Sequence, residues 1–175
     1  MTKTDWLKLL TCVGVCLLAG LIGGLATRSA LVEWYPYLVK PRVNPPAWVF
    51  GPVWTALYLT LAVATFLVWR RGIGRRGVNV ALVAAAGQLA LTAAWAPVFF
   101  GLRSIEGGLL VALALMFAVL LTILLFTRVA WTPAMLLVPY LLWVMFAIYL
   151  NGRILALNGF KPHVPTSDSG ATRPA

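Results

Sequence analysis

The chain of 175 residues is 62% hydrophobic and has a mean hydropathy of +0.92, which excludes an ordinary soluble domain and leaves room for one membrane domain. A net charge of +10 would point to nucleic acid in a soluble protein, but here the Lys and Arg residues fall between long apolar runs. Membrane loops have this pattern, with anionic lipid headgroups as partners. We therefore predict a multi-pass, all-α integral membrane protein that binds no nucleic acid.

The first apolar run, residues 7–27, is too long for the core of a signal peptide, so we expect it to remain as the first membrane span. Cys16, Gly20 and Gly24 recur every four residues along it. This spacing of small residues permits close contact with another helix, either within the chain or in a dimer. Cys12 lies one turn from Cys16 on the same predicted helix, where the two thiols cannot reach disulfide geometry.

Residues 28–46 form the longest connection and contain acidic, aromatic and proline residues, including Glu33, Trp34 and Tyr35. This composition predicts a structured lid over one mouth of the helix bundle, although an ordinary interfacial loop has a similar composition. Asn44 and the prolines that follow it predict a side-chain cap and a sharp start for the next helix.

A second span is expected at residues 47–69, which are apolar and uncharged over a length sufficient to cross a bilayer. Trp54 and Tyr58 lie four residues apart, so they share one helix face, and they lie too deep for an interfacial aromatic belt. We interpret this face as the wall of an internal site. An arginine-rich loop, residues 70–76, follows.

The third span, residues 78–100, carries two different faces, and Pro97 is expected to kink its last turn. The polar and aromatic face consists of Gln88, Thr92, Trp95 and Phe99. The small-residue face consists of Ala86, Ala90 and Ala94. We predict that the first face lines the internal site and that the second forms a homodimer interface, with Gly20 and Gly24 as the alternative interface.

The fourth span, residues 107–126, is apolar on every side, which predicts a lipid-facing wall. The fifth span, residues 133–152, again has a polar and aromatic face, made of Tyr140, Trp143, Ala147 and Asn151. Residues 1–158 would thus form a single five-helix domain, followed by a disordered tail at 159–175. Lys and Arg divide equally between the two predicted sides, so they give neither the orientation nor the membrane.

Several blocks of the sequence resemble one known family. They are EWY at 33–35, KPRVNPPAWVFGPVWTALY at 40–58, GQLALTAAWAPVFFG at 87–101 and VPYLLWVMFAIYLNGRILALN at 138–158. On these blocks the chain resembles the tryptophan-rich sensory protein and translocator protein family, also called peripheral benzodiazepine receptors. The resemblance implies a bundle of five transmembrane helices, frequent homodimers, and a cavity under the first loop that binds porphyrins, sterols and synthetic isoquinoline or benzodiazepine-type ligands.

Carried over position by position, the resemblance implies a ligand pocket formed by Trp34, Tyr35, Trp54, Trp95, Trp143 and Ala147. The helix faces add Tyr58, Gln88, Thr92, Phe99 and Asn151 to the expected ligand-binding residues. The family's sterol motif has a loose counterpart in Val144, Tyr149 and Arg153. The family usually has Trp at the position of Val43 and often Asn at that of Thr92, which leaves the ligand preference open.

We therefore expect a membrane receptor, sensor or carrier for a tetrapyrrole such as protoporphyrin IX or haem, bound as a ligand and not as an obligatory cofactor, with sterols as further ligands. Proton-coupled transport is disfavoured because no span has an ionisable residue in its interior. No catalytic or metal-ligating residue is expected, since the single histidine, His163, lies in the tail. The alternatives are breakdown of the tetrapyrrole through cavity tryptophans, and cholesterol translocation.

Overall fold

The computed structural model describes residues 2–159 as a bundle of helices without strands. The elements are α1 (Lys3–Glu33), the short 3₁₀ helix η1 (Tyr35–Tyr37), α2 (Ala47–Trp69), α3 (Val78–Ala96), the π-helical turn η2 (Pro97–Gly101), α4 (Ile105–Thr127), α5 (Trp131–Leu136) and α6 (Val138–Asn158). Within this part of the chain, five helical segments are long and apolar enough to cross a bilayer. The predicted all-α, five-span membrane fold is confirmed.

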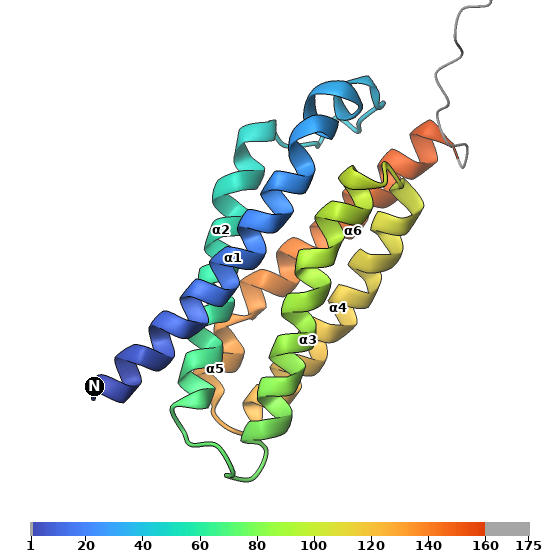
Figure 1. Cartoon of the computed structure of the whole chain (residues 1–175). Coiled ribbons are helices and arrows are strands. Elements are labelled where there is room, and N and C mark those ends of the chain that lie inside the picture. The colour runs from blue at the N-terminus through green and yellow to red at the C-terminus, as the bar shows by residue number, and fades with distance from the viewer. Residues whose placement is uncertain (1, 160–175) are drawn as a thin grey trace, which may run out of the picture.

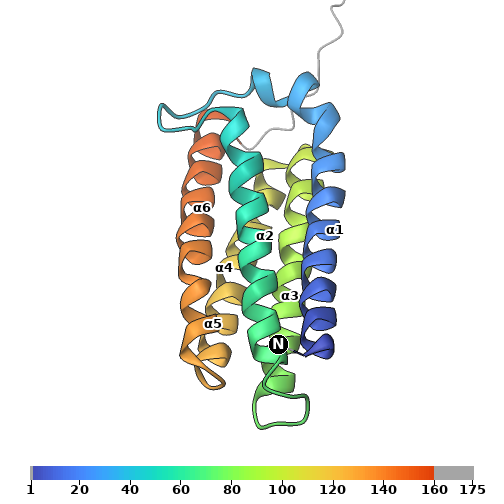
Figure 2. The ribbon, with the colours of Figure 1, turned by 90° about the vertical axis from the view of Figure 1, so that its left-hand side faces the viewer.

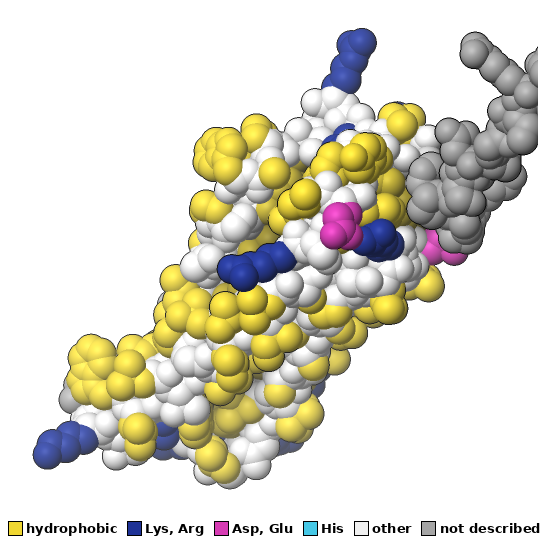
Figure 3. Space-filling model, turned by 45° about the horizontal axis from the view of Figure 1, so that its top comes forward, with side chains coloured by type: hydrophobic (Ala, Val, Ile, Leu, Met, Phe, Trp, Pro, Cys, Tyr) yellow, Lys and Arg dark blue, Asp and Glu magenta, His cyan; other side chains and the backbone are white. Residues whose placement is uncertain are grey.

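The helices lie roughly parallel to one axis (Figures 1 and 2). The start of α1, the arginine-rich loop and α5 lie at one end of the bundle. The opposite end is covered by residues 34–46, which we call the lid, and α6 also ends there. Side chains that face the viewer in Figure 3 are mostly hydrophobic along the helices, as expected for surfaces in contact with lipid.

At one end of the lid α1 is longer than the expected first span, whereas at the other end α2 begins at the expected residue 47 but without the expected side-chain cap. α1 begins with a capping box, in which Thr2 and Asp5 bond each other's backbone N–H groups, and it continues to Glu33, well past the expected end at residue 27. The prediction that Asn44 caps α2 is wrong, because the N-cap is Pro46 and makes no side-chain hydrogen bond. The amide of Asn44 instead makes hydrogen bonds within the lid, to the Tyr35 hydroxyl and the Pro45 carbonyl.

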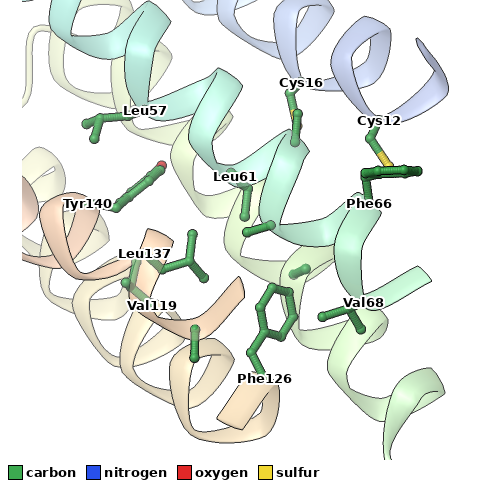
Figure 4. Packing of buried hydrophobic residues seen from close by; sticks show 14 of the residues in the cluster. Cys12, Cys16, Leu57, Leu61, Phe66, Val68, Val119, Phe126, Leu137 and Tyr140 are labelled. Carbon is green, nitrogen blue, oxygen red and sulfur yellow. The ribbon is translucent and has the colours of Figure 1, made fainter. Parts of the chain in front are cut away.

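The core lies between α1, α2, α3, α4, α5 and α6, where Leu57, Leu61, Phe126 and Tyr140 are buried (Figure 4). The expectation that the fourth span is only a lipid-facing wall is therefore wrong for one of its faces. That buried face of α4 consists of Gly108, Ala112, Leu115, Val119, Thr122 and Phe126. Hydropathy could not reveal it, because the buried and the lipid-exposed faces of α4 are equally apolar.

Two interruptions shape the third and fifth spans. Pro97 does not simply kink α3; the chain widens into η2, closed by a hydrogen bond from the Leu102 N–H to the Pro97 carbonyl at 2.9 Å. The fifth span begins at Trp131, breaks at Leu137 and extends to Asn158, so it is longer at both ends than residues 133–152. The predicted disordered tail lies outside the described residues, apart from Gly159.

Candidate ligand cavity

A cavity of about 690 Å³ lies between α1, α2, α3 and α6, in the half of the bundle nearest the lid. Most of the predicted ligand-binding residues line it. They are Tyr35, Trp54, Tyr58, Thr92, Trp95, Phe99, Ala147 and Asn151. Its volume falls within the range of about 300 to 1,000 Å³ that is typical of small-molecule pockets.

One wall of the cavity is a ladder of aromatic rings. Trp54 stacks on Trp95 with ring centroids 5.8 Å apart, and Trp95 stacks on Phe99 at 5.2 Å with an angle of 14° between the planes. Tyr58 continues the ladder from Trp54 at 6.4 Å. Since these rings come from two helices and the π turn, and Trp95 is stacked between Trp54 and Phe99, they form a rigid apolar wall that presents ring edges to the cavity.

The π turn holds the lid end of this ladder in place. Phe99 is buried, and the ring of Phe100 lies edge-on to that of Tyr35 in the lid at 5.7 Å. Gly108 of α4 leaves the space that Phe99 fills, because a Cβ atom there would lie 2.5 Å from its Cδ2. A side chain at position 108 would push the ring toward Trp95 and hence into the cavity wall.

Polar groups lie along the buried side of the cavity, on α3 and α6. Asn151 is 2% exposed, and neither its Nδ2 nor its Oδ1 has a hydrogen-bond partner among the described residues. The same holds for the indole Nε1 of Trp95. Thr92 donates to the carbonyl of Gln88, so the Tyr140 hydroxyl donates to Thr92 Oγ1 at 2.7 Å. The unpartnered Asn151 and Trp95 groups are buried from the cavity surface, so a ligand gains access to them only by displacing neighbouring side chains.

Three predicted residues do not line the cavity. Trp34 packs its ring edge-on against Phe99 at 5.5 Å and so supports the aromatic wall from behind. Gln88 is fully buried one turn beyond Thr92, on the side away from the lid. Trp143 packs edge-on against Phe50 at 6.1 Å.

The lid is fastened chiefly by Asn158, a side chain that the sequence did not single out. Asn158 accepts from the Val39 N–H at 3.0 Å and donates to the Val39 carbonyl at 2.9 Å, which ties the lid to the end of α6. The Tyr35 hydroxyl donates to Asn44 Oδ1 at 3.2 Å, and burial raises the pKa of Tyr35, so the phenol remains a donor at neutral pH. Nearby, Arg103 forms an ion pair with Glu33 at 2.7 Å.

The cavity is partly open, and the solvent exposure of its lining residues differs from one side to the other. The exposed lining residues are all on α1 and α2, among them Leu21, Leu25, Arg28 and Thr55. The lining residues on α3, η2 and α6 are buried or half-buried. The cavity therefore opens toward the α1 and α2 side, and Arg28 brings a positive charge to it.

The two small-residue faces have different surroundings. A Cβ atom at Gly20 would lie 2.9 Å from the ring of Tyr58, so Gly20 is needed for packing within the chain, and Cys16 is buried beside it. Gly24 lines the cavity. By contrast, Ala86 and Ala90 of α3 are exposed and Ala94 is half-buried. This leaves the α3 face as the candidate dimer contact.

The residues of the loose sterol motif do not lie together. Val144 is buried in the core, whereas Tyr149 and Arg153 face a separate groove beside the lid. No cluster of His, Cys, Asp or Glu within residues 2–159 could hold a metal ion, and His163 lies outside that range. Cys12 and Cys16 are free thiols.

Comparison with known proteins identifies one family along most of the chain. A model of the TspO/MBR family matches residues 12–157. The chain is 43% identical over 152 residues to the tryptophan-rich protein TspO of Chlorobaculum tepidum, covering 87% of this chain and 96% of that one. It is 36% identical over 161 residues to the tryptophan-rich sensory protein of Cereibacter sphaeroides (90% and 96%). It is 37% identical over 139 residues to the translocator protein of Bos taurus (78% and 82%).

Proposed function

Because the chain belongs to the TspO/MBR family, we propose that it binds a porphyrin such as protoporphyrin IX or haem in the cavity and acts as a membrane sensor or carrier for it. The observation that carries this proposal is the ladder Trp54, Trp95 and Phe99 along the wall of a cavity of about 690 Å³. A flat conjugated ring can lay its face against the ring edges of such a wall, and each edge-to-face aromatic pair adds about 0.5 to 1.5 kcal/mol beyond the area buried.

The polar groups of the cavity favour a ligand with the same distribution of polarity. Trp95 and Asn151 hold unpartnered N–H donors and an amide acceptor on the buried side, which a porphyrin substituent would bond after displacing neighbouring side chains. Arg28 lies on the open side, where a carboxylate substituent of a porphyrin can pair with it. A neutral sterol would make no use of that charge.

A sterol is the second candidate ligand, since most of the cavity lining is apolar and its open side is formed by lipid-exposed leucines such as Leu21 and Leu25. The sterol would occupy the same cavity, because the residues of the loose motif do not share one face. Movement of cholesterol across the membrane is the function that this candidate implies.

The test is a titration of the purified protein with protoporphyrin IX, haem and cholesterol, for wild type, Trp95→Ala and Trp131→Phe. Trp131 is 69% exposed at the start of α5, remote from the cavity, so its replacement controls for the loss of one indole. We expect Trp95→Ala to weaken porphyrin binding at least about tenfold, since it removes the central ring of the wall and releases Trp54 and Phe99, which stack on it. Equal porphyrin affinity in all three proteins would exclude this cavity as the binding site.

We also propose that the chain forms a homodimer through the exposed face of α3 around Ala90. Small residues let helix backbones approach closely in lipid, and Gly87 beside Ala90 has open space around its Cα. Ala90→Leu should therefore shift the protein toward monomers, as measured by cross-linking in bilayers. Phe117→Leu, on the exposed face of α4, is the control. A dimer that withstands Ala90→Leu must use another face.

A further inference from the structure

A second groove of about 420 Å³ lies outside the cavity, between the lid and the end of α6. Residues 39–43 of the lid form one wall, and Tyr149, Arg153 and Leu157 of α6 form the other. These three residues are spaced four apart, so they form one exposed stripe of α6.

The groove is positively charged. Lys40, Arg42 and Arg153 line it, and it contains no acidic residue. The only ion pair among residues 2–159, Arg103 with Glu33, does not involve the groove. Three cations without a counter-charge around one hollow favour an anionic ligand.

The shape of the groove is fixed by the protein. Asn158 bonds both backbone groups of Val39, which holds the lid wall against α6. Lys40 donates from Nζ to the carbonyls of Pro36 and Leu38, and its ammonium lies 4.8 Å from the centre of the Tyr35 ring. Because these contacts already hold the walls in place, binding a ligand costs little of the conformational entropy that ordering a loop would cost.

The position of the groove fits the level of the lipid headgroups. Arg153 lies little more than a turn from the end of α6, and Tyr149 lies one turn deeper. An arginine above a tyrosine near the end of a membrane helix is the usual arrangement at the headgroup layer. Beyond Tyr149, the exposed side chains Met145 and Leu142 continue an apolar surface along α6 that suits an acyl chain.

We propose that this groove binds the phosphate headgroup of an anionic phospholipid, held between Arg42 of the lid and Arg153 of α6. A lipid in this place bridges the two walls and so adds to the Asn158 contact that fastens the lid. Arginine suits this role because its planar guanidinium can bond two phosphate oxygens at once.

The experiment measures how much phosphatidylglycerol the detergent-solubilised protein retains, by native mass spectrometry, for wild type, Arg42→Gln/Arg153→Gln and Arg75→Gln/Arg76→Gln. The second pair removes the same charge from the exposed arginine-rich loop at the opposite end. Each basic side chain near an anionic lipid raises the binding constant by a factor of about five. The groove variant lacks two of them, so it should bind the first phosphatidylglycerol about 25-fold more weakly. The loop variant should retain it as wild type does.

Three results would overturn the proposal. An equal loss in both double variants would mean that the lipid responds only to overall charge. Equal retention of phosphatidylcholine by the wild type would mean that the groove does not select an anionic lipid. Displacement of the lipid by millimolar inorganic phosphate would identify a site for the free anion. All four arginines are exposed, so the variants should fold, and an unchanged thermal melt checks this.

Discussion

Replacement of Asn151 by leucine should stabilise the protein and weaken ligand binding at the same time. The amide is 2% exposed, and both of its polar atoms lack hydrogen-bond partners among residues 2–159. A buried polar group without a partner costs about 1 to 3 kcal/mol, and leucine has a similar volume without that cost. The melting temperature should therefore rise by about 2 to 4 °C for each kcal/mol recovered.

The same substitution removes the polar groups at position 151 that a ligand would bond. A hydrogen bond between neutral groups contributes about 1 kcal/mol net, so Asn151→Leu should weaken porphyrin binding about fivefold. Stability and affinity would then change in opposite directions. A residue needed only for packing would change both in the same direction or leave the affinity alone.

Gln88→Met is the matched control. Gln88 is also fully buried with both amide atoms unpartnered within the described chain, yet it does not line the cavity. Methionine keeps its length and flexibility. We expect Gln88→Met to raise the melting temperature without altering porphyrin affinity. The assays are thermal denaturation in detergent and fluorescence titration with protoporphyrin IX. If Asn151→Leu lowers the melting temperature, the amide is satisfied in the folded protein and the reasoning is refuted.

Further substitutions test the aromatic wall, the lid and the cavity. Gly108→Ala should lower stability by about 1 to 3 kcal/mol, since the new methyl group collides with Phe99, whereas Gly14→Ala on α1, with open space around it, should be neutral or stabilising in the same melts. Asn158→Ala should increase hydrogen exchange in the lid while leaving α4 unchanged; uniform exchange would contradict the role of this side chain. Ala147→Thr should crowd the cavity and reduce porphyrin affinity more than stability, and an unchanged affinity would move the ligand away from α6.

The sequence predicts which way a side chain points around a helix better than how deep it lies. The four-residue spacing placed Trp54 with Tyr58, and Trp95 with Phe99, on the faces that line the cavity. Gln88 follows the same face as Thr92 but lies beyond the inner end of the cavity. Periodicity could not reveal this, because the cavity occupies only the lid half of the bundle.

Other features depend on contacts between distant parts of the chain. The bonds between Asn158 and Val39 join residues that are 119 positions apart in the sequence, and no local pattern predicts them. The buried face of α4 cannot be read from hydropathy, since lipid and the protein interior are both apolar. The internal role of Gly20 is another such case: its small size predicted a close contact, but only the fold shows that the partner is Tyr58.

The open side of the cavity along α1 and α2 bears on how affinity should be measured. Leu21 and Leu25 line the opening and lie within a membrane-spanning helix, so a hydrophobic ligand can arrive by diffusing within the bilayer. Its relevant concentration is then its mole fraction in lipid, which depends on partitioning from water. Dissociation constants expressed in bulk aqueous units should therefore increase with the amount of lipid or detergent, while the occupancy at a fixed mole fraction stays constant.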